Sequence, residues 1–333
     1  MGARARQLLR IGRWAALTLP GGCAWDLPMS TAVARSDLAR EILSVYSVLV
    51  WAAIGITTVV FVALVYVLAR FRERPGAPLP RQTRGHTLLE IAWTVAPALV
   101  LLVIAIPTIQ VIFTTQGAAR PDALPVLVVG RQWWWEFQYP TLGVVTANEL
   151  HLPAGRRVVL QLEGEDVIHS FWVPLLGGKR DVIPGRKNLL TLTADTPGEY
   201  WGQCAEFCGA SHANMRLRVI VDPPEAFEMW LRGQRVPAAE PTGVAAEGKA
   251  IYARNACVGC HVIRGLSAGT LGPDLTHFGS RSTLAAGLYP NTVEHVTAWL
   301  KDPPALKPGV KMPRLGLTDE QARAVATYLL SLK

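Results

Sequence analysis

The residues with the most distinctive chemistry lie in one stretch, Glu199 to Arg216, which reads EYWGQCAEFCGASHANMR. Within it, Cys204, Cys208, His212 and Met215 form the pattern C-x3-C-x3-H-x2-M. Thiolate, imidazole and thioether together select copper for electron transfer, with the thioether as a weak axial ligand. A mononuclear blue-copper centre uses one cysteine, so two such close cysteines favour bridging thiolates that hold two coppers. A structural Cys2His2 zinc site is the alternative, although zinc has no use for the methionine.

A histidine far upstream is the candidate for closing this site. His169 lies in the stretch DVIHSF, residues 166–171, in a strand-rich part of the sequence. A single histidine in such a place is more often structural, but a β-barrel can bring it to a Cys/His/Met loop. We therefore expect His169 to be a copper ligand.

A second motif with metal chemistry is CVGCH, residues 257–261. C-x-x-C-H attaches a c-type haem, with Cys257 and Cys260 as thioethers and His261 as the proximal iron ligand. Met312, followed by a proline, fits the second axial ligand, and His/Met ligation raises the haem potential. A thiol–disulfide motif is the alternative, but no βαβ pattern surrounds these cysteines.

Two long apolar runs precede the copper motif. They extend from about residue 42 to 69 and from about 88 to 112, and each could cross about 30 Å of hydrocarbon. The loop between them is rich in arginine: Arg70, Arg72, Arg74, Arg81 and Arg84. The positive-inside rule makes this loop cytoplasmic, so everything after residue 115 lies on the other side of the membrane. The sequence thus predicts a transmembrane hairpin over residues 40–115.

Glu90 is the one charged residue in the second run. A carboxylate inside a membrane is costly, so such a residue is a functional candidate. Its position near the cytoplasmic end also allows the alternative of a glutamate at the interface.

Residues 1–22 have the pattern of a secretory signal: four arginines, a short apolar stretch and small residues. Cys23 follows directly, as at a bacterial lipoprotein cleavage site, although Pro20 is atypical there. A lipidated Cys23 and a cysteine in an uncleaved or plainly cleaved leader both remain open.

Residues 116–225 change to short alternating segments with Pro/Gly turns, a pattern typical of an all-β sandwich or barrel. The expected strands are Leu124–Val129, Trp133–Tyr139, Arg157–Glu163, Asn188–Thr193 and Met215–Val221. Within Trp133-Trp134-Trp135, strand alternation should turn Trp134 away from the face of its neighbours. Core packing must account for at least one of the three, and an exposed one could accept an electron.

The last part of the chain is expected to be helical. A polar linker over residues 226–243 leads to residues 244–333, where Ala245–Asn255 reads as a short helix. Thr318 and Gln321 form a capping box before an amphipathic stripe.

The formal net charge of +8 is unevenly distributed. Residues 241–333 hold ten Lys and Arg against six Asp and Glu, whereas residues 116–225 hold ten against twelve. We therefore expect the haem domain to dock on the copper domain, near Glu165 and Asp166, with the linker supplying a high effective concentration. The sequence lacks the interleaved basic and aromatic residues that would indicate nucleic acid as a partner.

From about residue 40 to its end, the chain resembles cytochrome c oxidase subunit II of the haem–copper oxidase superfamily, in the bacterial form with a C-terminally fused cytochrome c domain. The motifs are H-x3-E-x2-W-T-x2-P from His86, G-x-Q-W-x-W from Gly130, D-V-x-H-S-F from Asp166, D-x-I-P-G-R from Asp181, and the cysteine loop. The resemblance implies a two-helix transmembrane hairpin, an all-β cupredoxin (Greek-key barrel) domain and an all-α class I cytochrome c domain.

The resemblance also implies a binuclear CuA centre, in which Cys204 and Cys208 bridge both coppers. His169 and Met215 would bind one copper. The other would be bound by His212 and the backbone carbonyl of Glu206.

Three further residues match functional positions of the family. The carboxylate of Glu206 would reach a magnesium or manganese ion at the interface with subunit I. Trp133 matches the tryptophan through which electrons reach copper. Glu90 matches a carboxylate at the mouth of a proton channel into subunit I.

The function implied is that of the electron-transfer subunit of a proton-translocating cytochrome c oxidase. Cytochrome c or a quinol:cytochrome c reductase would reduce the haem, the haem would reduce CuA, and CuA would reduce subunit I, where O2 becomes water. The partners would be subunit I, other oxidase subunits and membrane lipid. The chain would cross a bacterial plasma membrane more than once, with both metal domains on the extracytoplasmic side.

Three rival functions are weighed against this one. A membrane-anchored electron carrier for another terminal reductase is the main alternative. A quinol oxidase subunit II shares the anchor and barrel but lacks the copper ligands. Nitrous oxide reductase carries a CuA loop but is soluble and has a histidine-rich domain.

Overall fold

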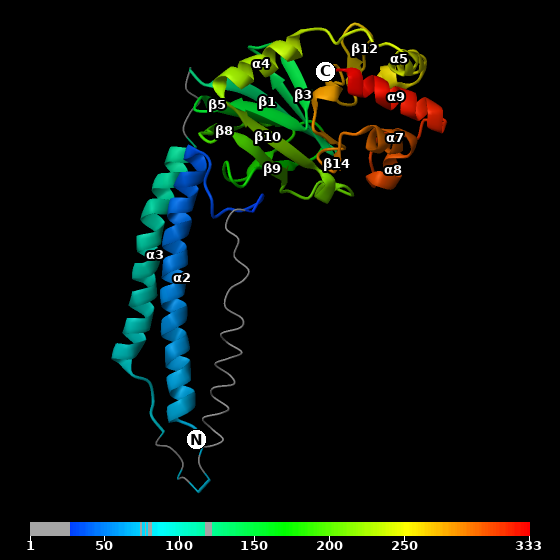
Figure 1. The fold of residues 1–333 in the computed structure, drawn as a ribbon. Helices are drawn as coiled ribbons and strands as arrows, with labels where there is room; N and C mark the ends of the chain where they lie inside the picture. Colours follow the sequence, from blue (N-terminus) through cyan, green and yellow to red (C-terminus); the bar gives the residue numbers. More distant parts are fainter. Residues whose placement is uncertain (1–26, 74, 77, 79–81, 117–121) are drawn as a thin grey trace, which may run out of the picture.

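The computed structural model describes residues 27–73, 75–76, 78, 82–116 and 122–333 (Figure 1). The expected leader and Cys23 lie outside the described residues. A pair of long helices, a β-sandwich and a small helical domain follow one another along the chain.

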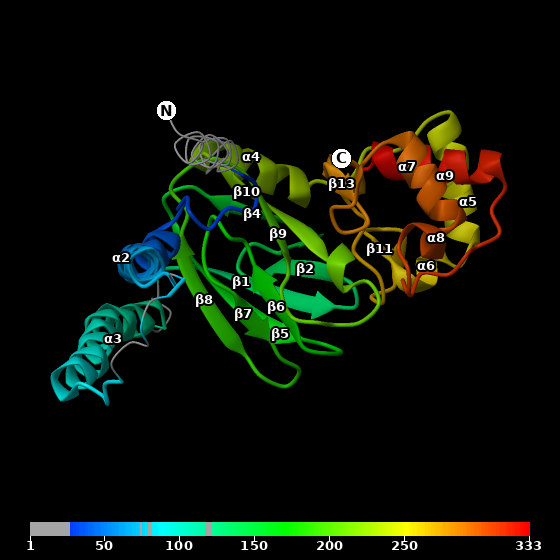
Figure 2. The same cartoon turned by 90° about the horizontal axis from the view of Figure 1, so that it is seen from below.

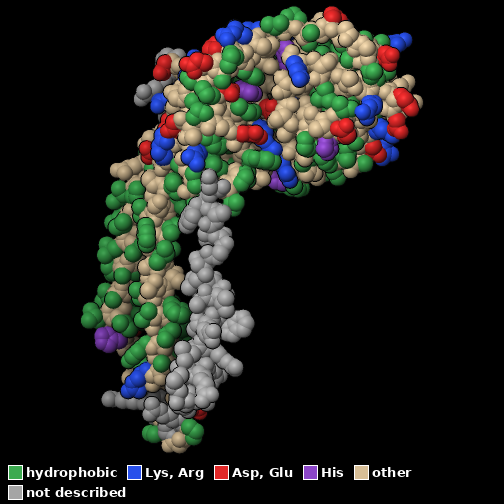
Figure 3. All heavy atoms as spheres, in the orientation of Figure 1, with side chains coloured by type: hydrophobic (Ala, Val, Ile, Leu, Met, Phe, Trp, Pro, Cys, Tyr) green, Lys and Arg blue, Asp and Glu red, His purple; other side chains and the backbone are tan. Residues whose placement is uncertain are grey.

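Helices α2 (Asp37–Arg70) and α3 (Thr87–Thr115) lie side by side (Figure 1). Both are long and apolar enough to cross a membrane, with mean hydropathies of 2.6 and 2.5. Hydrophobic side chains cover them, whereas charged side chains gather on the two domains (Figure 3). Helix α2 begins five residues before the expected apolar run. Ser36 as N-cap and Asp37 in the first turn favour a helix start, but they are polar and so lie outside that run.

The first turn of α2 is fastened to the sandwich. Asp37 accepts the backbone N–H of Thr193 at 2.6 Å, and Arg40 pairs with Asp195 at 2.5 Å. Leu38, next to Asp37, is buried in the core of the sandwich. These contacts fix the β-sandwich to the end of the hairpin.

Two five-stranded sheets form the sandwich, in the orders β3-β2-β1-β5-β8 and β4-β10-β9-β6-β7. Their strands are β1 (Leu124–Arg131), β2 (Trp134–Tyr139), β3 (Val144–Ala147), β4 (Glu149–Pro153), β5 (Arg157–Gly164), β6 (His169–Trp172), β7 (Arg180–Val182), β8 (Asn188–Thr193), β9 (Gly198–Cys204) and β10 (Arg216–Asp222). The β1–β5 and β4–β10 pairs are parallel and the others antiparallel. One apolar core fills the space between the sheets. The all-β domain expected from the sequence is confirmed.

The tryptophan triplet departs from the expected strand by one residue. Strand β2 begins at Trp134, so Trp133 lies in the preceding turn and strand alternation does not set its direction. Trp135 is fully buried, while Trp134 is half-buried with the guanidinium of Arg131 5.4 Å from its ring. The expected alternation therefore holds only for the last two tryptophans.

The expected linker is partly wrong. Residues 224–235 form helix α4 (Pro224–Arg235), which packs on the sandwich through the buried side chains of Phe227 and Leu231. A proline at the helix start and apolar residues at i and i+4 explain this helix. The connection without helix or strand is residues 236–243.

The last domain is helical, as expected, and sits against one end of the sandwich (Figure 2). Its elements are α5 (Val244–Arg254), α6 (Cys257–Cys260), β11 (Val262–Ile263), β12 (Ser267–Ala268), β13 (Thr283–Leu284), β14 (Tyr289–Pro290), α7 (Val293–Lys301), α8 (Pro303–Leu306) and α9 (Asp319–Ser331). Helices α5 and α9 approach closely at Gly248, where a Cβ would lie 2.0 Å from the carbonyl oxygen of Ala324. The capping box of Thr318 and Gln321 is present at the start of α9.

Candidate metal centres

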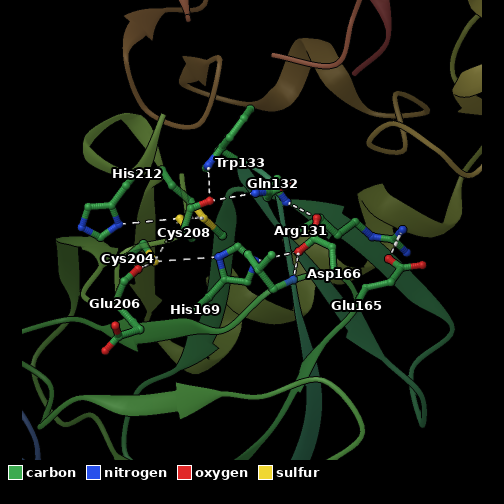
Figure 4. Close-up of polar contacts among 12 residues, drawn as sticks. Arg131, Gln132, Trp133, Glu165, Asp166, His169, Cys204, Glu206, Cys208 and His212 are labelled. Carbon is green, nitrogen blue, oxygen red and sulfur yellow. Dashed lines mark hydrogen bonds and ion pairs between the residues drawn. The ribbon is translucent and has the colours of Figure 1, made fainter. Parts of the chain in front are cut away.

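The cysteine loop connects β9 to β10 at one end of the sandwich, so the strands position its ligands (Figure 4). Cys204 is the last residue of β9, and Met215 directly precedes β10. The two thiol sulfurs are 3.8 Å apart. His212 Nδ1 lies 3.6 Å and Met215 Sδ 3.9 Å from the Cys208 sulfur.

His169 and Glu206 complete the group, and both lie near the sulfur of Cys204. His169 begins β6, and its Nδ1 lies 3.9 Å from the Cys204 sulfur. The backbone carbonyl of Glu206 lies 3.2 Å from the same sulfur. The structure thus brings all the predicted copper ligands together. Two thiolates, two imidazoles and a thioether are a donor set that fits copper.

Burial and hydrogen bonding prepare the thiols as ligands. Both cysteines are 3 % exposed, and Met215 is fully buried. The contact with the Cys208 sulfur, helped by His169 and opposed by burial, holds the pKa of the Cys204 thiol well below its usual range. The same contact raises the pKa of the Cys208 thiol. One thiolate is therefore available to a metal at neutral pH.

Asp166 orients the histidine of β6. Its Oδ1 lies 2.9 Å from His169 Nε2, which turns Nδ1 toward the sulfurs (Figure 4). Its Oδ2 accepts the backbone N–H of Gln132 at 2.8 Å. Burial opposes the shift, but these bonds lower the pKa of Asp166 and keep it a carboxylate. Such partners fix the direction and basicity of a metal-binding imidazole.

Sequence reasoning missed this positioning role of Asp166 and proposed the residue only as a docking contact. The i, i+3 spacing of Asp166 and His169 was the available signal. The docking contact is also present, because Lys311 of the haem domain lies 3.3 Å from Asp166 Oδ2. The same expectation is wrong for Glu165, which pairs with Arg131 of its own domain.

Trp133 touches the copper loop but is not an exposed aromatic. Its indole N–H donates to the carbonyl of Cys208 at 2.9 Å. Only 7 % of the residue is exposed, because the haem domain covers it. The expected exposure of an electron-accepting tryptophan is therefore wrong for Trp133 in this chain.

Two other predicted site residues lie apart from the sulfurs. The carboxylate of Glu206 is exposed and points away from them (Figure 4). Glu90 is exposed in the first turn of α3. The structure does not bring either carboxylate to the copper ligands.

The C-x-x-C-H motif forms the short helix α6 and the residue after it. His261 Nδ1 lies 2.8 Å from the carbonyl of Pro273, which leaves Nε2 free for iron. Gly272 lies against the imidazole, since a Cβ there would be 2.4 Å from His261 Cε1. Burial lowers the pKa of His261, which favours the neutral imidazole that binds metal. Met312 is half-buried against the core of this domain. These residues fit a covalently attached haem.

The fold and the two sites define a membrane-anchored electron-transfer protein, in which a cupredoxin-type β-sandwich is joined to a c-type cytochrome domain. Family models match a part of each of the three domains. They describe the transmembrane domain of cytochrome c oxidase subunit II over residues 24–111, its periplasmic domain over 142–222 and cytochrome c over 245–333.

Similar curated proteins carry the same family name. Cytochrome c oxidase subunit 2 of Alkalihalophilus pseudofirmus is 38% identical over 94% of this chain and 93% of its own length. That of Bacillus sp. (strain PS3) is 36% identical over 79% and 80%. A solved periplasmic domain of cytochrome oxidase subunit II from Bradyrhizobium japonicum is 30% identical over 35% of this chain and 97% of that one, with a TM-score of 0.34.

The chain belongs to the cytochrome c oxidase subunit 2 family, in the form with a fused cytochrome c domain. It is therefore a subunit of an oxidoreductase complex and associates with other oxidase subunits. The family domains indicate copper in the sandwich and haem c in the helical domain.

Proposed function

We propose that this subunit passes electrons from its haem c to a binuclear CuA centre and on to the catalytic subunit I of a proton-translocating oxidase. The observation that carries the proposal is the convergence of imidazole, thioether and carbonyl donors on two sulfurs 3.8 Å apart. When bound, the copper pair and the haem would supply one-electron storage at two neighbouring sites.

The chain's own residues hold this arrangement still. Cys204 and Cys208 would hold the two coppers, and their burial excludes water from the sulfurs. His169, Met215, His212 and the Glu206 carbonyl would supply the remaining donors. Because the strands and Asp166 fix these donors, little has to reorganise when an electron leaves.

The remaining functional residues are assigned on family resemblance. Cys257 and Cys260 would attach the haem, and His261 and Met312 would hold its iron. The carboxylate of Glu206 is free to reach a magnesium or manganese ion at the interface with subunit I. Glu90 lies at the mouth of a proton channel into that subunit.

The proposed topology follows from the arginine-rich loop between α2 and α3, which stays in the cytoplasm. Residues 40–115 form the hairpin in a bacterial plasma membrane. The copper domain, from residue 116 through α4, and the cytochrome domain, residues 244–333, then lie on the extracytoplasmic side. Cytochrome c or a quinol:cytochrome c reductase would supply the electrons there.

Electron paramagnetic resonance and visible spectra of the purified chain test the proposal. We expect two equivalent coppers sharing one unpaired electron, beside a low-spin c haem. A Cys208→Ser variant should lose the shared-electron signal and keep the haem spectrum. A single-copper signal or a zinc-loaded sandwich in the unmodified chain would refute the binuclear assignment. Failure of a large haem-containing membrane subunit to co-purify would favour a free-standing carrier for another reductase.

A further inference from the structure

One buried polar contact between the cytochrome and copper domains is at Glu149, the first residue of β4. Only 4 % of Glu149 is exposed. Its Oε1 accepts the backbone N–H and hydroxyl of Ser282 at 2.9 and 2.8 Å. The same oxygen accepts the backbone N–H and hydroxyl of Thr283 at 2.9 and 3.1 Å. Separating the domains would remove all four donors from one carboxylate.

A second buried contact lies over the copper loop. Lys307, 2 % exposed, donates from Nζ to the carbonyl of Trp133 at 2.6 Å. The hydroxyl of Ser211, beside the ligand His212, donates to the carbonyl of Pro308 at 2.5 Å. Burial lowers the pKa of Lys307 to about 7, so this amine is well removed from water.

The turn that follows Lys307 closes over the indole of Trp133. Gly309 has a φ of +77°, and a Cβ there would lie 3.0 Å from Trp133 Cη2 and 3.0 Å from the Cβ of Ala210. Three residues later comes Met312, the proposed axial ligand. The segment that carries the proposed iron ligand therefore rests directly on the tryptophan that contacts the copper loop.

A third contact ties the domain to α4. Arg264 Nη1 lies 3.5 Å from the carbonyl of Gln234 and 3.3 Å from that of Arg235, at the C-terminus of α4. Cations are favoured at this end of a helix. The three contacts lie on different elements of the copper domain, so together they restrict rotation as well as separation.

The expected charge pair contributes less than these contacts. The side chain of Lys311 is 64% exposed in its pair with Asp166. Exposed pairs are screened by salt and contribute little. Glu149 and Lys307 are shielded from solvent, so their contacts should persist at high ionic strength.

We propose that the fused cytochrome domain is permanently docked, that Glu149 and Lys307 are the residues that position it, and that this docking closes Trp133 to any second cytochrome. The electron donor must then dock on the outer surface of the cytochrome domain. The inference rests on the proposed function only for the identity of the two metal centres.

Cleavage of the connection tests the docking itself. A protease site is inserted within residues 237–242 of the full-length chain, which is purified in detergent, cleaved and passed through a sizing column at low and high salt. We expect the cytochrome domain to stay bound to the copper domain at both salt concentrations. Glu149→Ala and Lys307→Met should weaken its retention at least about tenfold, because each leaves buried polar groups unpaired. Lys311→Met is the matched control and should behave like the unmodified chain.

A second measurement follows access to Trp133. A soluble cytochrome c added after cleavage should reduce copper faster in the Glu149→Ala and Lys307→Met proteins than in the unmodified one. Glu149→Gln keeps an acceptor oxygen, so its rate of copper reduction should lie between those of the unmodified protein and Glu149→Ala. An unchanged haem spectrum verifies that each variant is folded. Release of the unmodified domain, or full retention in both variants, would overturn the proposal. Retention as expected without haem-to-copper transfer would instead overturn the proposed function and leave the docking intact.

Discussion

Replacement of Gly309 by alanine tests whether the close contact of this residue with Trp133 positions the cytochrome domain. The new Cβ would lie 3.0 Å from both Trp133 Cη2 and the Cβ of Ala210, against about 3.5–4.0 Å for comfortable carbon contacts. Overpacking of this kind costs about 1–3 kcal/mol. The φ of +77° adds a further cost of about 1–2 kcal/mol for any L-residue.

Gly316→Ala is the matched control, because Gly316 has a φ of +66° but no atom within 4 Å of its Cβ position. Both variants carry the left-handed backbone cost, and only Gly309→Ala carries the contact with the copper domain. Their difference of about 1–3 kcal/mol therefore belongs to docking. It corresponds to a docked population about 5–150-fold lower relative to the undocked one.

Two assays distinguish these costs. Thermal unfolding of the cytochrome domain, followed by haem absorbance, should show similar losses for both variants. Copper reduction by the photoreduced haem, and retention after cleavage, should fall for Gly309→Ala and remain nearly normal for Gly316→Ala. Equal transfer rates and equal retention in the two variants would refute the idea that close approach to Trp133 positions the domain.

Four further substitutions test other parts of the structure. Met312→His should keep a low-spin haem but lower its potential in a redox titration; an unchanged potential would exclude Met312 as a ligand. Gly248→Ala should destabilise the cytochrome domain by about 3 kcal/mol or more in thermal unfolding, because its Cβ would lie 2.0 Å from a backbone oxygen of α9. Gly233→Ala on α4, where nothing lies within 4 Å of the Cβ position, should leave stability unchanged or raise it. A loss of stability like that of Gly248→Ala would contradict the argument that α5 and α9 need a glycine where they cross. Asp166→Asn should alter the copper hyperfine pattern while retention after cleavage stays within about twofold; the reverse result would make Asp166 chiefly a docking residue.

The clustering of the candidate copper ligands could be predicted from the sequence because most of them lie in one short motif. Cys204, Cys208, His212 and Met215 occupy one loop, and the strands on either side need only bring its ends together. His169 was predictable because a Cys/His/Met loop needs a further imidazole. The membrane helices were equally clear, since the first apolar run has no charged residue and the second has only Glu90.

The contacts between the domains could not be predicted in the same way. Glu149 looks like an ordinary surface carboxylate, because its hydrogen-bond donors are 133 and 134 positions away in the sequence. The exposure expected of Trp133 was wrong for the same reason, since its cover comes from residues after 306. Helix α4 was taken for linker because its polar residues outnumber the apolar stripe that packs on the sandwich. Charge counts predicted a docking contact at Asp166, and its pair with Lys311 is an exposed part of the interface.

The buried contacts change the physical role of the connection between the domains. A flexible chain of eight residues has a root-mean-square span of about 15 Å, which would keep a mobile domain at high local concentration. Here Arg264 contacts the last carbonyls of α4, where that connection begins. The connection therefore joins surfaces that already meet, and it need not search for them. Electron transfer between the two centres would then depend on fixed packing at Trp133, and only the arrival of the external donor would depend on diffusion.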